Sequence, residues 1–454
     1  MIRGFGILRL LSIRDFSYSA CGPDAGRWRD DVVKTRALRI YGKQDLRLET
    51  FDLPEMQEDE ILAEIVTNSV CMSSHKAASL GGEHKRVPDD VHERPTIIGH
   101  EFAGYVRAVG KRWRDQFEPG MKFAIQPALG YEGSLDAPGY SFRYLGGMAS
   151  FVLVPSPVME MGCLLPYAGP DFFKASLSEP MSCIIGSTHA QYHVDYGCYE
   201  HKMGIVEHGA CAVLAGAGPM GLGLVDYLVH GPRQPALLVV TDVDQARLDR
   251  AATIVPVDEA ARCGVQLVYL NPKNHEPAVT HMLGLCPDKA GFDDVFVFAP
   301  VAALVEQGDA LLARDGCLNF FAGPTTADFR ALFNFYNVHY GGTHIVGTSG
   351  GNTDDMREAL SLMAESTVNP AAMVTHIGGI SCACDTILNL PHIPGGKKLV
   401  YTQYDLPLTA ISDFENAAEN SPLFAELAQI CDRHNGLWNI QAEQYLLDHG
   451  PKLP

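Results

Sequence analysis

The sequence has little of what membrane spans, nucleic-acid binding and disulfide frameworks require. No run of eighteen apolar residues occurs in the 454-residue chain, so we expect no membrane-spanning helix. Basic residues are in deficit, because 35 Lys and Arg stand against 54 Asp and Glu and the formal net charge is −19. Such a chain lacks the basic surface that nucleic acid requires. Twelve cysteines without a dense repeated spacing fit a reducing cytoplasm better than a disulfide framework.

The N-terminal segment also lacks the unbroken apolar centre of a secretory signal, because Arg9 and Arg14 interrupt its apolar patch. Arg and Ser with few acids leave a transit peptide as an alternative interpretation. The first convincing strand is 37–41, and Val33-Lys34-Thr35 just ahead of it resembles a natural start. We therefore expect residues 1–33 to be an extension outside the fold.

The remaining chain has enough apolar residues for two cores, since 46% of 454 residues are hydrophobic. Residues 35–190 carry short apolar runs separated by Gly and Pro, which is typical of a β-rich domain. From about residue 208, strand-like and helix-like runs alternate, which predicts an α/β domain with a doubly wound parallel sheet. After residue 372 the chain returns to strand-like pieces and ends in a helical tail at 411–449.

Residue types that bind zinc occur in the β-rich part. Cys71 ends an apolar run, His100 and Glu101 follow Gly99, and Glu179 precedes a proline that restrains its backbone. A catalytic zinc ion takes three protein ligands of the thiolate, imidazole and carboxylate types and leaves one position open. We therefore predict Cys71, His100 and Glu179 as ligands, with Glu101 as the fourth candidate. His100 and Glu101 would face opposite sides of a regular strand, so both can reach one metal only where the backbone turns. Glu101 holds the local structure in one interpretation and exchanges with Glu179 in another.

A nucleotide-binding turn opens the alternating part. Gly216, Gly218 and Gly221 form a GxGxxG motif after an apolar strand and before a predicted helix, whose positive end near Pro219 and Met220 would stabilise pyrophosphate. Asp242 ends the next strand, where a carboxylate accepts hydrogen bonds from ribose hydroxyls and repels a 2′-phosphate. The sequence therefore predicts NAD(H) in preference to NADP(H).

These motifs resemble, over residues 35–454, the zinc-dependent medium-chain alcohol and polyol dehydrogenases, in particular the sorbitol-dehydrogenase-like branch. The resemblance implies a GroES-like β-rich catalytic domain at 34–190 and 372–454 and a Rossmann domain at 191–371. It also implies a homodimer or homotetramer. The structural zinc lobe of many relatives needs four clustered cysteines, and residues 104–161 contain none, so we expect one catalytic zinc per subunit.

The resemblance further implies a proton path that begins at Ser73. His75 or Lys76 would extend this path, although either fits an exposed helix position equally well. Ser74 stands where the family usually has an Asp that orients the histidine ligand, which leaves that role open.

Longer segments, among them Pro138–Phe142, Gly347–Asp355 and Gly395–Tyr401, look like those of L-sorbose-1-phosphate reductases. Such enzymes interconvert L-sorbose 1-phosphate and D-glucitol 6-phosphate with NAD(H). Because a sugar phosphate needs nearby cations, we name as candidates Lys76, His84, Lys85, Arg86 and Arg143. Two alternatives stay open: a dehydrogenase of free polyols, and a catalytically idle nucleotide-binding protein.

Overall fold

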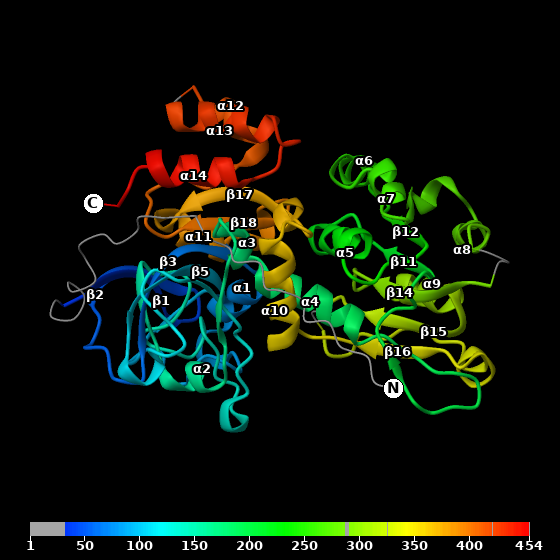
Figure 1. The fold of residues 1–454 in the computed structure, drawn as a ribbon, viewed down its shortest axis with the longest axis horizontal. Coiled ribbons are helices and arrows are strands. Elements are labelled where there is room, and N and C mark those ends of the chain that lie inside the picture. Colours follow the sequence, from blue (N-terminus) through cyan, green and yellow to red (C-terminus); the bar gives the residue numbers. More distant parts are fainter. Residues whose placement is uncertain (1–31, 287–289, 325, 420, 454) are drawn as a thin grey trace, which may run out of the picture.

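The computed structural model describes residues 32–286, 290–324, 326–419 and 421–453. The extension expected at 1–33 lies outside these residues except for Val32 and Val33, and the Val33 carbonyl accepts a hydrogen bond from the amide of Leu53. Two halves lie side by side, a β-rich half and a parallel-sheet half (Figure 1). Within the described ranges, no helix combines the length and the apolar character needed to span a bilayer.

The parallel-sheet half contains the six-stranded sheet that the alternating pattern predicts. The strand order is β13-β12-β11-β14-β15-β16, and every neighbouring pair is parallel. The central strand β11 has the sequence ACAVL and is buried along its whole length, as a strand covered on both faces must be. The strands are β11 (Ala210–Leu214), β12 (Leu237–Thr241), β13 (Gln266–Leu270), β14 (Phe292–Val297), β15 (Leu312–Phe320) and β16 (His344–Gly347). The accompanying helices are α5 (Pro219–His230), α6 (Gln245–Ile254), α7 (Val257–Arg262), α8 (Ala278–Leu283) and α9 (Ala302–Leu311).

The β-rich half is built on an eight-stranded sheet that takes strands from distant parts of the chain. β17 (Val374–Gly379), β18 (Lys397–Tyr401) and β19 (Thr409–Ala410) continue a sheet that β3 (Ile61–Val70), β5 (Glu101–Val109), β6 (Lys122–Ile125), β7 (Phe151–Val154) and β8 (Leu164–Pro166) form. β3 and β5 approach closely at Gly104, where an added Cβ would lie 1.9 Å from the Glu64 carbonyl oxygen. A smaller sheet contains β1 (Lys34–Gly42), β2 (Asp45–Asp52) and β4 (Thr96–Ile97), and β9 (Tyr192–His193) pairs with β10 (Lys202–Met203).

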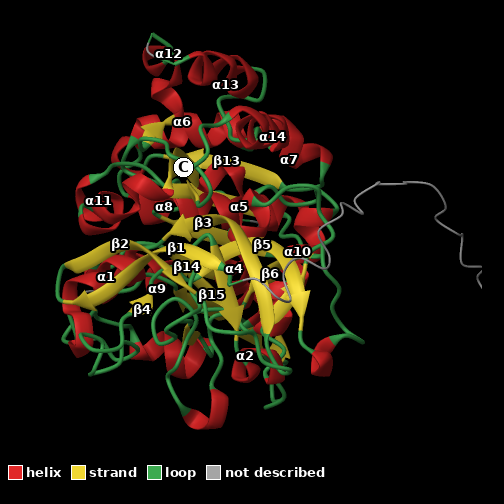
Figure 2. Ribbon diagram, turned by 90° about the vertical axis from the view of Figure 1, so that its left-hand side faces the viewer, coloured by secondary structure: helices red, strands yellow, loops and turns green. Residues whose placement is uncertain are grey.

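Helices join the two halves and cover the β-rich sheet. Figure 1 shows α4 and α10 where the two halves meet. The Asn352 side chain caps α10 by accepting hydrogen bonds from the amides of Asp354 and Asp355. In Figure 2 the C-terminal helices α12, α13 and α14 lie above the strands. The remaining α-helices are α1 (Met72–Leu80), α2 (Ser156–Glu160), α3 (Phe173–Ser176), α4 (Ser178–His189), α10 (Thr353–Ala364), α11 (Ala383–Leu388), α12 (Phe414–Ala417), α13 (Pro422–Asp432) and α14 (Ile440–His449).

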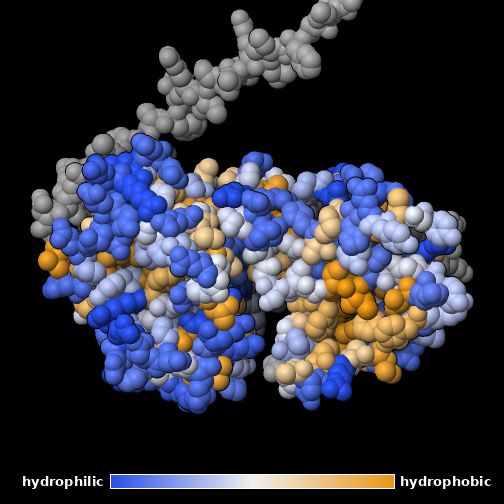
Figure 3. Space-filling view, turned by 90° about the horizontal axis from the view of Figure 1, so that it is seen from below, coloured by the Kyte–Doolittle hydropathy of each residue, from blue (hydrophilic) through white to orange (hydrophobic). Residues whose placement is uncertain are grey.

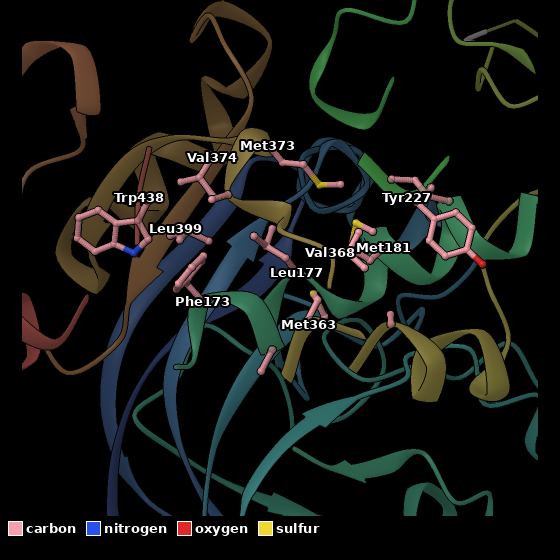
Figure 4. Packing of buried hydrophobic residues seen from close by; sticks show 14 of the residues in the cluster. Phe173, Leu177, Met181, Tyr227, Met363, Val368, Met373, Val374, Leu399 and Trp438 are labelled. Carbon is pink, nitrogen blue, oxygen red and sulfur yellow. The ribbon is translucent and has the colours of Figure 1, made fainter. Parts of the chain in front are cut away.

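One hydrophobic cluster runs through both halves. Figure 4 shows Trp438 and Leu399 at one end, Leu177 and Met181 in the middle, and Tyr227 of α5 at the other. Leu177, Met181 and Leu399 are fully buried, so α4 is packed firmly between the two sheets. The surface is hollowed between the two lobes, and the lobe at the right of Figure 3 carries a broad hydrophobic area.

Candidate active site

A cavity of about 830 Å³ lies between the two halves. Its wall includes Cys71, His100, Glu101 and Glu179 on one side and Pro219 and Met220 on the other. The fold therefore brings the predicted metal ligands and the start of the nucleotide-binding helix to one space, although the ligands lie between 40 and 148 positions before Pro219 in the sequence.

Cys71 lies at the junction of β3 and α1, where the chain passes from an extended backbone into the helix. The Ser73 hydroxyl lies 3.1 Å from Cys71 Sγ and 3.2 Å from His100 Nε2. Burial raises the pKa of the Cys71 thiol. A divalent cation at this point would favour the thiolate, as it does in zinc sites.

His100 and Glu101 face the same space because His100 lies in the turn just before β5 and Glu101 is the first residue of that strand. Gly99 makes this turn with φ +100°, in the left-handed region that favours glycine. The ligand atoms of Cys71, His100 and Glu101 all lie within 4.8 Å of one another. Burial lowers the pKa of His100, so the imidazole is neutral at neutral pH, which is the form that binds metals.

Glu179 approaches from the second position of α4, with Pro180 in the first helical turn, where a proline costs no hydrogen bond. Its Oε1 atom accepts only a weak hydrogen bond from the Cys183 thiol, at 3.6 Å. Burial, followed by repulsion from Glu101, raises the pKa of Glu179 to about 7. Glu179 is half-buried and lies outside the group of donor atoms formed by Cys71, His100 and Glu101. A half-buried carboxylate with so weak a hydrogen bond fits a site that a cation completes. Thiol, imidazole and carboxylate donors together match the donor set of catalytic zinc.

Lys397 of β18 is a charged residue of the site that the sequence pattern did not single out. Its Nζ atom lies 2.6 Å and 2.7 Å from the two carboxylate oxygens of Glu101, and both side chains are buried. Burial opposes the charge of Lys397, but Cys71 and Glu101 outweigh it and raise the lysine pKa. Glu101 is thus paired directly with Lys397, whereas for Glu179 burial and repulsion from Glu101 outweigh the attraction of Lys397. The sequence did contain a signal for this residue, because Lys397 and Lys398 are charged residues inside an apolar strand. The segment that contains them was considered only for its similarity to other proteins.

Ser74 stands where the resemblance would place an Asp that orients the histidine ligand. Its hydroxyl lies 3.4 Å from His100 Nδ1, on the opposite side of the ring from Ser73. A serine therefore contacts the ring nitrogen at the place where a family member would have an acid, and the two serines together hold the imidazole ring in position.

Tyr140 covers the outer face of His100 and was not predicted as a site residue. The two ring centroids lie 5.0 Å apart, and the ring of His84 stacks on Tyr140 at 5.5 Å with an interplanar angle of 6°. The glycine before it, Gly139, has φ +77° and lies so close to Gly99 that an added Cβ would meet the Gly99 carbonyl at 2.0 Å. The turn 138–142 is therefore packed directly on the turn that presents His100.

His75 and Lys76 lie on α1 but are not among the residues that line the cavity. The His75 ring is held on the other side of the helix, because Nδ1 lies 2.9 Å from the Ile387 carbonyl oxygen and Nε2 lies 3.3 Å from the Ser79 hydroxyl. Lys76 is exposed. Of the three residues predicted for the proton path, the structure places only Ser73 at the cavity.

The glycine motif forms a tight turn between β11 and α5. An added Cβ on Gly221 would lie 2.2 Å from the Gly216 carbonyl oxygen, so the turn closes on itself, whereas the space beside Gly218 is open. Pro219 is the first residue of α5, and its N-terminal end faces the cavity with Met220. An open glycine at a helix N-terminus is the geometry that admits a pyrophosphate.

Asp242 follows the last residue of β12 at the carboxyl edge of the sheet, as predicted. Its Oδ1 atom accepts the amide of Asp244 at 3.0 Å, which fixes the side chain. Lys273 also lies at this edge, which the sequence did not predict. Its Nζ atom donates a hydrogen bond to the Val243 carbonyl at 3.2 Å.

Comparison with known proteins identifies the family. Residues 57–161 match the alcohol dehydrogenase GroES-like domain. The chain is 51% identical to mannitol-1-phosphate 5-dehydrogenase of Aliivibrio fischeri, over 92% of this chain and 98% of the relative. It is 50% identical to L-sorbose 1-phosphate reductase of Klebsiella pneumoniae, over the same shares of the two chains. Sorbitol dehydrogenase of Mus musculus is 28% identical, over 75% of this chain and 88% of the relative.

The chain belongs to the zinc-dependent medium-chain alcohol and polyol dehydrogenase family. Solved structures agree in fold: 2R,3R-butanediol dehydrogenase of Bacillus subtilis superposes with a TM-score of 0.62 at 18% identity, over 81% of this chain and 99% of the other. The short chain alcohol dehydrogenase rspB of Escherichia coli CFT073, complexed with NADH, gives a TM-score of 0.59 at 16% identity, over 81% and 99%. The predicted fold class, a GroES-like domain with a Rossmann-like parallel sheet, is confirmed.

Proposed function

We propose that this protein is a zinc- and NAD(H)-dependent oxidoreductase that interconverts L-sorbose 1-phosphate and D-glucitol 6-phosphate. The observation that carries the proposal is the shared cavity, in which Cys71, His100 and two glutamates face the nucleotide-binding turn. Support for a phosphorylated substrate comes from relatives at about half identity that are named for sugar phosphates. Oxidation of a free polyol remains the second candidate, because sorbitol dehydrogenase is a more distant relative.

In this proposal Cys71, His100 and Glu179 hold one zinc ion per subunit, and Glu101 is the fourth candidate. When bound, zinc supplies a Lewis acid for the substrate oxygen and NADH supplies a hydride. Ser73 lies beside both Cys71 and His100, so its hydroxyl can donate a proton to the substrate oxygen during reduction and accept one during oxidation. His75 and Lys76 lie off the cavity, so the path from Ser73 to solvent does not require them.

The cofactor and domain assignments are part of the same proposal. Gly216, Gly218 and Gly221 would admit the pyrophosphate, and Asp242 would accept the ribose hydroxyls and favour NAD(H) over NADP(H). The boundaries 34–190 with 372–454, and 191–371, follow the division of strands between the two large sheets. We place the protein in the cytoplasm, because every cysteine of the described residues is a free thiol. We expect a homodimer or homotetramer. An edge available for pairing with a second subunit is β16, the last strand of its sheet, which exposes Ile345.

The test is Cys71→Ala, measured by zinc content and by NADH turnover on L-sorbose 1-phosphate. We expect the variant to lose zinc and to lose at least about a thousandfold in rate, which corresponds to roughly 4 kcal/mol of transition-state stabilisation. The unmodified protein should contain one zinc per chain. Activity that persists in zinc-free protein would contradict the metal assignment, and a zinc-free, inactive natural chain would favour the idle nucleotide-binding alternative.

A further inference from the structure

We propose that Arg86, carried on the Tyr140 ring, is the residue that binds the phosphate group of the substrate. This inference rests on the proposed function and names the specificity-determining contact within that site. It selects one residue from the five basic candidates that the sequence offered.

The first observation is the position of the guanidinium. The Cζ atom of Arg86 lies 5.5 Å from the centroid of the Tyr140 ring, and that ring contacts the imidazole of His100. Arg86 is therefore separated from the candidate zinc ligand by a single aromatic ring. Neither Arg86 nor Tyr140 is among the residues that line the cavity, so the proposal places the phosphate at the margin of that space. In L-sorbose 1-phosphate the phosphate is on C1, next to the C2 carbonyl that is reduced, so a cation that binds this phosphate must lie close to the metal.

The second observation is that Arg86 has unused hydrogen-bonding capacity. Its Nε atom is buried and has no hydrogen-bond partner among the described residues. Buried polar atoms without a partner are rare, and an N–H donor of a guanidinium is best satisfied by a phosphate or carboxylate oxygen.

The third observation is the surrounding charge. His84 has a lowered pKa, because burial and the nearby charges of Arg86, Lys85 and Lys76 all disfavour its protonated form. In a chain with a net charge of −19, this is a local concentration of positive charge beside the site. Such a concentration attracts a dianionic substrate.

The backbone holds Arg86 firmly in place. The Ser141 hydroxyl donates to the Arg86 carbonyl at 2.6 Å, and the Arg86 amide donates to His84 Nδ1 at 3.3 Å. The next residue, Val87, is buried in the β-rich core. These contacts fix the backbone that carries the guanidinium, which limits the entropy lost when the side chain binds a ligand.

The other candidates lack this combination. Lys76 and Lys85 are exposed. Arg143 is also exposed, and its guanidinium stacks on Tyr144, 5.2 Å from that ring centroid, rather than on Tyr140. Lys398 lines the cavity, but its Nζ atom already donates to the carbonyls of Ile393, Pro394 and Gly396.

The experiment compares kcat/KM for L-sorbose 1-phosphate and for free L-sorbose, with NADH, in the zinc-loaded unmodified protein and in Arg86→Met. Arg94→Met is the matched control, because Arg94 lies in the same loop but is exposed and paired with Asp90. We expect Arg86→Met to lower kcat/KM for the phosphorylated sugar about a hundredfold, mostly through KM, and to change that for free sorbose less than threefold. Arg94→Met should leave both values within twofold.

A second readout uses inorganic phosphate as the probe. It should inhibit the unmodified enzyme competitively against L-sorbose 1-phosphate, with an inhibition constant that rises at least tenfold in Arg86→Met. If Arg86→Met does not fold, Arg86→Lys serves instead, because it keeps the charge but loses the Nε donor, and we expect about a tenfold loss on the phosphorylated sugar only.

Equal losses on both sugars would overturn the inference, because Arg86 would then act only by supporting Tyr140 and His100. An unchanged preference for the phosphorylated sugar in the Arg86 variants would also overturn it, while leaving the proposed function intact. If the unmodified enzyme itself shows no preference for the phosphorylated sugar, the proposed substrate is wrong and the inference fails with it.

Discussion

The ion pair between Lys397 and Glu101 allows the sharpest test of how the site is stabilised. Both carboxylate oxygens of Glu101 contact the Lys397 ammonium, at 2.6 and 2.7 Å, and the exposed fractions of the two residues are 1% and 9%. Lys397→Met leaves a buried carboxylate without its cation, which typically costs about 3–5 kcal/mol. Glu101→Gln leaves the buried ammonium without its anion and should destabilise the protein by a similar amount.

The double variant Lys397→Met/Glu101→Gln removes both charges and should recover most of the loss, with a coupling free energy of at least about 2 kcal/mol. The assay is urea unfolding of zinc-depleted protein at pH 7, with the midpoint and slope measured for all four proteins. With zinc present, Lys397→Met should lose less stability, because Glu101 is then free to interact with the metal. Additive losses in the two single variants would refute the view that these charges depend on each other.

Two further predictions concern the cofactor and the C-terminal helix. Asp242→Ala should reduce the ratio of kcat/KM with NADH to kcat/KM with NADPH. If the unmodified protein prefers NADPH, this prediction is wrong, and Lys273 would be the residue that binds the 2′-phosphate. Glu443 of α14 accepts the amides of Phe172 and Phe173, and burial raises its pKa to about 7. The pKa of Glu443 in the folded protein exceeds the usual value of 4.5, so the protonated carboxyl stabilises the fold. This contribution is complete below pH 4.5 and decreases as the pH rises to about 7. The unfolding free energy of the natural protein should therefore fall by roughly 3 kcal/mol relative to Glu443→Gln between pH 5 and 8, and parallel curves would contradict this.

The sequence predicted the elements well because their signals are local. The predicted strands at β11 and β12 follow from apolar runs, a signal that residues close together in the sequence provide. The ligand types at Cys71 and His100 were also readable, since each closes or opens a strand in a recognisable motif.

The contacts that complete the site were not readable, because they join residues far apart in the chain. Lys397 lies 296 positions from Glu101, and nothing local in either segment specifies the pair. The contact of Tyr140 with His100 depends on how two glycine turns pack on each other. The orientation of His75 depends on its contact with the Ile387 carbonyl of α11, 312 positions away in the chain.

The most direct test of the central claim is the ratio of kcat/KM for L-sorbose 1-phosphate to that for free L-sorbose, measured with NADH and zinc-loaded protein. The proposed function, with a fixed cation beside the zinc site, predicts a ratio of a hundred or more, on the order of 3 kcal/mol. Equal efficiency on the two sugars would contradict it and would assign the protein to the dehydrogenases of free polyols.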